Sequence, residues 1–82
     1  MAMGTVRYWA AAKAAAGVAE ESFEAATLGE LVAKITANEE LGRVLPRCSF
    51  LVNGQPAGKR DPYQVELPQG AVVEVLPPFA GG

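Results

Sequence analysis

Histidine is absent from the 82 residues, and the only cysteine and serines are Cys48, Ser22 and Ser49. Without histidine the chain lacks the usual general base and the commonest metal ligand. A single cysteine cannot form an internal disulfide or build a zinc or iron–sulfur site, and we expect it to be a small buried hydrophobe. The serines have no imidazole to activate them, and no G-x-S-x-G or P-loop pattern occurs. We therefore expect no metal site and no self-contained active site, so the function should lie in binding or in a terminus.

Positive charge and long apolar runs are also scarce. The formal net charge is −2, and among the seven Lys and Arg only Lys59 and Arg60 are adjacent, which gives no basic field to attract nucleic acid. A membrane span needs about 20 consecutive apolar residues, and a signal peptide needs a basic start followed by an apolar stretch. The first 17 residues have neither, because Arg7 and Lys13 interrupt them. We expect a cytoplasmic protein with neither nucleic acid nor membrane as a partner.

What the sequence does contain is enough apolar material for one small core. Half of the residues are hydrophobic and 20% are charged, which is the balance of a globular domain rather than of a disordered chain. A chain of 82 residues has room for one such domain.

Alternation of apolar and polar residues predicts an opening strand over residues 5–10. Val6 and Tyr8 lie on one of its faces. Arg7 and Trp9 lie on the other, so Trp9 faces water if Arg7 does.

The next segment, residues 10–16, is rich in alanine and stops at Gly17. It favours a helical turn, but in so short a domain we interpret it as a turn between strands. Residues 20–25 then alternate again, which predicts a second strand antiparallel to the first. Its glutamates could in principle pair for acid–base chemistry, but they are more typical of a solvated strand face.

A helix start is marked by Thr27-Leu28-Gly29-Glu30, which has the form of a capping box. Apolar residues then recur at helical spacing and predict a main helix ending near Asn38. A short turn before Pro46, a buried strand over residues 50–52 and the turn Asn53-Gly54 follow. Residues 55–64 have the composition of a loop.

The last strand is predicted over residues 71–76, with Val73 and Val75 facing the core and the residues between them facing out. This order of elements predicts an α+β domain: a mixed sheet of about four to five strands with one main helix packed on one face. The other face is left exposed, with Trp9 and Leu76 on it. The body should comprise residues 1–76 and an extended, flexible tail residues 77–82.

The tail, Pro77-Pro78-Phe79-Ala80-Gly81-Gly82, carries the candidate chemistry. Proline cannot donate to a sheet ladder, so the last strand should stop and the chain should leave the body. Six extended residues reach about 20 Å, enough to enter a partner's pocket. Two glycines without Cβ atoms can thread a narrow channel and present an unhindered carboxylate. The plain alternative is a frayed terminus without function.

A C-terminal carboxylate, with a pKa of about 3.5, is ionised at neutral pH and is a poor electrophile. Transfer of adenylate from ATP would activate it, and sulfide delivered to the acyl-adenylate would give a thiocarboxylate, a soft nucleophile. The terminus itself would then be the reagent, with AMP as a transient group and no permanently bound cofactor.

The segment from Leu76 to Gly82 closely resembles the C-terminus of the MoaD family, the small subunit of molybdopterin synthase, within the group that includes ThiS and ubiquitin. The turn Val52-Asn53-Gly54 and residues 67–75 also fit that family. The resemblance implies a ubiquitin-like β-grasp fold and a role in molybdenum cofactor synthesis. Two positions depart from the family pattern: Ala71, where an acidic residue is frequent, and Pro56, where an apolar patch residue is common.

By this resemblance a MoeB-type enzyme adenylates Gly82 and a sulfurtransferase converts it to the thiocarboxylate. The tail inserts into a MoaE-type large subunit, where the sulfur builds the dithiolene of a pterin precursor. Gly82 carries the sulfur, Gly81 lets the tail thread, and Phe79 lies in the partner's channel; the other inserted residues are Ala80, Pro78 and Pro77. Trp9 and Leu76 match an exposed apolar patch on which the partners dock. The chain itself would be a non-catalytic carrier subunit.

Three other functions remain open. The first is a sulfur carrier for thiamine or cysteine synthesis, against which the two prolines before Phe79 argue. Another is a protein modifier, in which Gly82 joins a target lysine. The last is an interaction domain whose tail does nothing.

Overall fold

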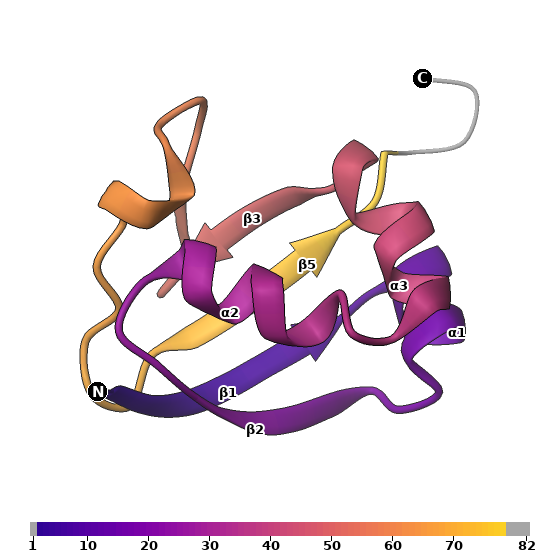
Figure 1. Cartoon of the computed structure of the whole chain (residues 1–82), viewed down its shortest axis with the longest axis horizontal. Coiled ribbons are helices and arrows are strands. Elements are labelled where there is room, and N and C mark those ends of the chain that lie inside the picture. The colour runs from indigo at the N-terminus through magenta and orange to yellow at the C-terminus, as the bar shows by residue number, and fades with distance from the viewer. Residues whose placement is uncertain (1, 79–82) are drawn as a thin grey trace.

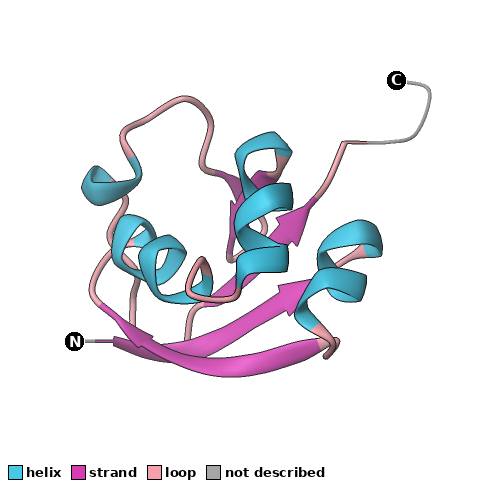
Figure 2. Ribbon diagram, turned by 45° about the vertical axis from the view of Figure 1, so that its right-hand side comes forward, coloured by secondary structure: helices cyan, strands magenta, loops and turns pink. Residues whose placement is uncertain are grey.

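The structure is a computed structural model that describes residues 2–78, in which helices gather on one side of a single sheet (Figures 1 and 2). The strands are β1 (Ala2–Tyr8), β2 (Glu20–Ala25), β3 (Ser49–Val52), β4 (Gln55–Pro56) and β5 (Val72–Leu76). Their order in the sheet is β2-β1-β5-β3-β4. β1 and β5 are parallel and the other neighbours are antiparallel. The predicted mixed sheet is confirmed, with five strands.

The helices are α1 (Ala10–Ala16), α2 (Leu28–Ile35) and α3 (Glu39–Val44), followed by the short 3-10 helices η1 (Leu45–Arg47) and η2 (Pro62–Gln64). No helix in the described part of the chain has the length and apolar character that crossing a membrane requires. The predicted main helix corresponds to α2, and the structure adds α1 and α3 to it.

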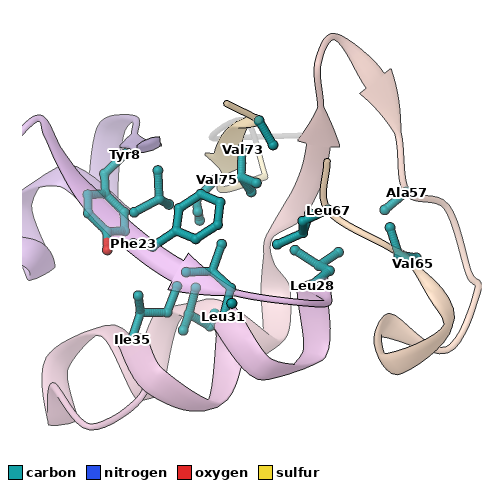
Figure 3. Packing of buried hydrophobic residues seen from close by; sticks show 14 of the residues in the cluster. Tyr8, Phe23, Leu28, Leu31, Ile35, Ala57, Val65, Leu67, Val73 and Val75 are labelled. Atoms are coloured by element: carbon teal, nitrogen blue, oxygen red, sulfur yellow. The ribbon is translucent and has the colours of Figure 1, made fainter. Parts of the chain in front are cut away.

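The core lies between the sheet and α2 (Figure 3). Val6 and Tyr8 enter it from β1, and Val73 and Val75 enter it from β5; all four are at most 2% exposed. On the other side of the core, one face of α2 contributes Leu28, Leu31 and Ile35. The predicted inward positions of the first and last strands are confirmed.

The capping box predicted at the start of α2 is present. The Oγ1 of Thr27 accepts a hydrogen bond from the Glu30 N–H at 3.2 Å, and the Glu30 Oε1 accepts one from the Ala26 N–H at 3.3 Å. The helix ends at Ile35, three residues earlier than predicted. The reason is that the side chain of Asn38 accepts from the N–H groups at the start of α3, which makes Asn38 the N-cap of a separate helix.

The interpretation of residues 10–16 as a turn was wrong, because they form α1. Alanine has the highest helix propensity, and the helix is closed by Gly17, whose φ of 79° is left-handed and whose N–H donates to the Lys13 carbonyl at 3.0 Å. Ala12 is fully buried, so packing against the body stabilises this short helix. As a consequence β1 ends at Tyr8, and Ala10 is helical rather than part of the first strand.

The segment around β3 also differs from prediction. Its residues are half-buried or exposed, not fully buried, because only Phe50 and Val52 pack against the core and β3 lies near the edge of the sheet. The turn Asn53-Gly54 is confirmed: both residues have positive φ, 50° and 81°, as a two-residue hairpin requires. The hairpin partner is the two-residue β4, within the segment predicted to be loop.

Cys48 was predicted to be buried and is half-buried. It packs against the core, and its S–H donates to the Val44 carbonyl at 3.3 Å. Partial burial raises the pKa of this thiol.

Candidate functional site

The candidate site begins where β5 ends. This strand lies between β1 and β3, and its last residue is Leu76, directly before Pro77, so the prediction that the prolines terminate the sheet is confirmed. Figure 1 shows this end of β5 beside α1 and α3. The predicted tail positions Phe79, Ala80, Gly81 and Gly82 lie outside the described residues.

Trp9 and Leu76 come together at this end of the sheet. Tyr8 pairs with Val75 in the parallel register, and the Trp9 N–H donates to the Val75 carbonyl at 3.2 Å, which places Trp9 alongside Leu76. Trp9 is 42% exposed, as the strand alternation predicted, and Leu76 is half-buried. The chain therefore holds an exposed indole next to the residue from which the tail departs.

Sequence reasoning missed a third apolar residue of this face, Leu51. The antiparallel register pairs it with Glu74, between the inward-facing Val73 and Val75, so Leu51 points away from the core. Residues that lie opposite one another on neighbouring antiparallel strands point to the same face of the sheet, so Leu51 shares the outer face with Glu74. Leu76, two residues after Glu74, lies diagonally across from Leu51 on that face. We call Trp9, Leu51 and Leu76 the outer patch.

The two departures from the family pattern have simple structural settings. Pro56 is exposed and pairs with Leu51, so it extends the apolar surface beside the outer patch. Ala71 is fully buried at the entrance to β5, and its carbonyl accepts from the Thr5 N–H at 2.9 Å. Both positions therefore hold an apolar side chain that its surroundings accommodate.

Arg7 lies next to the outer patch. Its guanidinium carbon is 5.2 Å from the centre of the Trp9 ring, and its Nε is 3.7 Å from the Glu20 Oε1. At an exposed site a cation over an aromatic ring contributes about 0.5–1 kcal/mol, and an exposed ion pair contributes less. The contact favours one position of the indole on the surface.

The root of the tail is also apolar. Pro77 and Pro78 line a hollow of about 210 Å³ with Ala11, Val44 and two arginines, Arg43 and Arg47. The Arg43 guanidinium is 3.6 Å from the Glu40 carboxylate. Apolar surface with guanidinium groups beside it suits docking of another protein.

Among residues 2–78 this region holds no group of side chains suited to bind a metal ion, because no three His, Cys, Asp or Glu side chains gather closely enough to hold one. Glu20 and Glu24 of β2 lie on the outer face of the sheet, whereas Glu21 lies on the helix side and accepts a hydrogen bond from the Tyr8 hydroxyl. What the described geometry offers is a docking surface beside the base of a terminal segment.

Comparison with protein families matches residues 6–82 to the ThiS family. Comparison with curated proteins gave no match.

Solved structures match along nearly the whole chain. One is the complex of subunits 1 and 2 of molybdopterin-converting factor from Helicobacter pylori: 29% identity, covering 98% of this chain and 99% of that chain, with a TM-score of 0.75. A Pyrococcus furiosus chain assigned as molybdopterin converting factor, subunit 1, is 26% identical over 96% of this chain and 100% of its own, with a TM-score of 0.80. The small archaeal modifier protein 1 of Methanosarcina acetivorans is 21% identical over 100% and 98%, with a TM-score of 0.84, a likeness of fold alone. The predicted ubiquitin-like β-grasp fold is thus confirmed.

Proposed function

This chain belongs to the ThiS family, and from that premise we propose that it is a sulfur carrier for molybdenum cofactor synthesis, the small subunit of a molybdopterin synthase. The observation that carries the proposal is the junction of Trp9 and Leu76, which sets an exposed apolar surface at the point where the tail leaves the sheet. The likeness to subunit 1 of molybdopterin-converting factor, in a structure where it is bound to subunit 2, supports the choice of pathway.

The proposed chemistry takes place on Gly82. Its carboxylate oxygen attacks the α-phosphorus of ATP, bound by a MoeB-type enzyme, and pyrophosphate leaves. Sulfide supplied by a sulfurtransferase then attacks the carbonyl carbon, forms the C–S bond, breaks the C–O bond and releases AMP. The thiocarboxylate enters a MoaE-type large subunit, where its sulfur becomes part of the dithiolene of the pterin precursor.

The body contributes docking rather than proton transfer. An exposed aromatic residue in an apolar patch is the kind of side chain that dominates binding energy at protein interfaces. The outer patch would therefore bring each partner to the root of the tail, with Arg43 and Arg47 facing acidic groups of the partner. No cofactor would be bound between loading events, and the compartment would be the cytoplasm.

A second candidate is a carrier for thiamine or cysteine synthesis. The name of the family that the chain matches, ThiS, supports keeping this candidate. All the steps up to the thiocarboxylate are shared, and only the acceptor of the sulfur differs. Delivery of sulfur to a pterin precursor by the loaded protein with its large subunit distinguishes the two.

The test uses an adenylating enzyme of the MoeB type and ATP, with pyrophosphate release as the readout. Removing Gly82 should leave a folded protein that supports no release, because the chain then ends in the Gly81 carboxylate, one residue short of the position that the reacting group must reach. Trp9→Ala should lower the affinity for the enzyme at least about tenfold, as truncation of an interface hot spot does. Met3→Ala is the matched control, because Met3 is 53% exposed on the same face of β1 at the end away from the tail.

Two results would contradict the proposal. Undiminished release after loss of Gly82 would show that the reacting group lies elsewhere. Equal losses for Trp9→Ala and Met3→Ala would show that the outer patch is not the docking surface.

A further inference from the structure

β2 is an outer strand of the sheet, and half of its main-chain groups point away from β1. The Tyr8 N–H donates to the Ala19 carbonyl at 2.8 Å. From there β1 and β2 pair residue by residue as far as Ala2 opposite Ala25. Because hydrogen-bonding direction alternates along an antiparallel strand, the N–H and C=O of Ser22 point to the open edge. So do those of Glu20 and Glu24.

One contact confirms this direction. The Nζ of Lys34, on α2, donates to the Glu24 carbonyl, which could not happen if that carbonyl faced β1. The edge is thereby covered at Glu24 and left open at Ser22 and Glu20 within the described part of the chain.

A hollow of about 370 Å³ adjoins this edge, between β2 and α2. Its lining includes buried apolar residues, Phe23 from the strand and Leu31, Ile35 and Leu41 from the helical side, together with the polar residues Glu21, Lys34 and Asn38. Figure 3 shows the Phe23 ring on the strand and the Leu31 and Ile35 side chains on the helix facing one another. An open strand edge beside a hollow that can receive side chains is the arrangement on which extended peptides add as an extra strand.

The two faces of β2 differ in chemistry. The side chains of Glu20, Ser22 and Glu24 lie on the outer face of the sheet and are exposed, whereas Glu21 and Phe23 lie on the helix side beside the hollow. A strand added at this edge would also alternate between the two faces. Its residues on the helix side would meet the hollow, which is lined by Phe23 and Ile35 and by the Glu21 carboxylate, and its residues on the outer side would meet the carboxylates of Glu20 and Glu24.

We infer that the edge of β2 and the adjoining hollow form a second docking site, whose partner is an extended protein segment that alternates apolar with basic side chains. The site shares no residue with the outer patch or the tail, so it does not rest on the proposed sulfur chemistry. A partner held there would leave the tail available to a different protein.

A second copy of this chain does not fit the site. Antiparallel pairing of two β2 strands about Ser22 would set Glu20 of each copy opposite Glu24 of the other, and like charges directly opposite are destabilising. The other edge of the sheet offers only the two-residue β4, which includes Pro56, and proline cannot donate to a ladder.

The test is a titration with a synthetic peptide of the length of β2, six residues, alternating lysine and valine. Amide NMR of the labelled protein should show shifts and slowed solvent exchange at Ser22, with affinity that falls as salt is raised. A glutamate–valine peptide of the same length is the matched control and should not bind.

Two variants separate main-chain pairing from general attraction. Ser22→Pro removes the outward N–H without breaking the ladder to β1 and should weaken binding about tenfold, whereas Ser22→Ala keeps that N–H and should bind as the parent does. Glu24→Lys reverses an exposed charge and should also weaken binding, which keeps the test decisive if the proline variant does not fold.

Several outcomes would overturn the inference. They are equal binding of the acidic peptide, amide shifts confined to the outer patch, and equal affinity of a folded proline variant and the alanine variant. Self-association of the protein through β2 would overturn it as well.

Discussion

At the scale of single residues, Gly4 shows how closely β1 is approached by β2 on one side and by the start of β5 on the other. A Cβ at this position would lie 2.3 Å from the Ala71 carbonyl oxygen and 2.8 Å from the Phe23 ring. The carbonyl belongs to the main chain and cannot rotate away, so an added methyl group must displace β5 or β1. The residue is therefore required for close approach, not for turn geometry.

We predict that Gly4→Ala lowers the free energy of unfolding by about 3 kcal/mol, in the upper part of the range for overpacked sites. Urea denaturation measures the change. Gly42→Ala is the control, because its Cβ would make an ordinary 3.6 Å contact in α3 and alanine favours a helix. Equal urea midpoints for the Gly4→Ala and Gly42→Ala variants, or a Gly4→Ala variant as stable as the parent, would show that the sheet relaxes around residue 4.

Tyr8 is a buried residue whose ionisation bears on stability. Its side chain is 2% exposed, and its hydroxyl donates to the Glu21 carboxylate at 2.5 Å. Burial first, then the hydrogen bond and the charge of Glu21, raise the pKa of this phenol above its ordinary value of 10.0. The folded protein thus retains a proton that the unfolded chain loses above pH 10.

The contribution of Tyr8 to stability should therefore be complete below pH 10 and be lost as the pH rises above it, by up to about 1.4 kcal/mol per pH unit. Tyr8→Phe removes this contribution, so its stability should depend less on pH in that range. Parallel urea titrations from pH 8 to about pH 11 compare the two slopes. Identical slopes would mean that the Tyr8 hydroxyl is not held neutral by the fold.

At the scale of elements, α2 depends on its first turn. Thr27 satisfies the Glu30 N–H, one of the backbone donors that a helix start leaves without an internal partner. We predict that Thr27→Ala costs about 1 kcal/mol, and that Thr27→Ser, which keeps the hydroxyl, costs only a few tenths. Thermal and urea unfolding of the three proteins would measure both changes, and equal losses would assign the effect to the methyl group instead of the cap.

Elements with a strong local signal could be predicted from the sequence. The capping box located α2, and alternation located the inward residues of β1 and β5. α1 could not be predicted, because alanine propensity alone does not show whether so short a helix will find packing, and the burial of Ala12 depends on contacts with the body. β4 was missed because a two-residue strand has no periodicity.

The site was predictable only in part for a similar reason. Alternation put Trp9 and Leu76 on the exposed face, but their adjacency depends on the parallel pairing of β1 with β5, strands far apart in the sequence. Leu51 was assigned to a buried strand, because three consecutive apolar residues hide the alternation that its pairing with Glu74 reveals. The roles of the last four residues remain predictions.

At the scale of the whole molecule, the sheet has surfaces of different character. The outer patch lies where β5 ends, beside the root of the tail, whereas the acidic edge of β2 runs along one side of the sheet (Figure 1). The molecule is small, with a Cα radius of gyration of 11.6 Å, yet these surfaces share no residue. A carrier that meets several enzymes in turn needs such separation, so that one partner can bind while another receives the tail.

In the proposed function the body presents Gly82 for loading with sulfur. The mass of the C-terminal peptide after co-expression with a MoeB-type adenylating enzyme and a sulfurtransferase measures this loading. We expect one oxygen of the Gly82 carboxylate to be exchanged for sulfur, and Trp9→Ala to reduce the exchanged fraction. An unchanged carboxylate under these conditions, or Gly82 joined to a lysine of another protein, would contradict it.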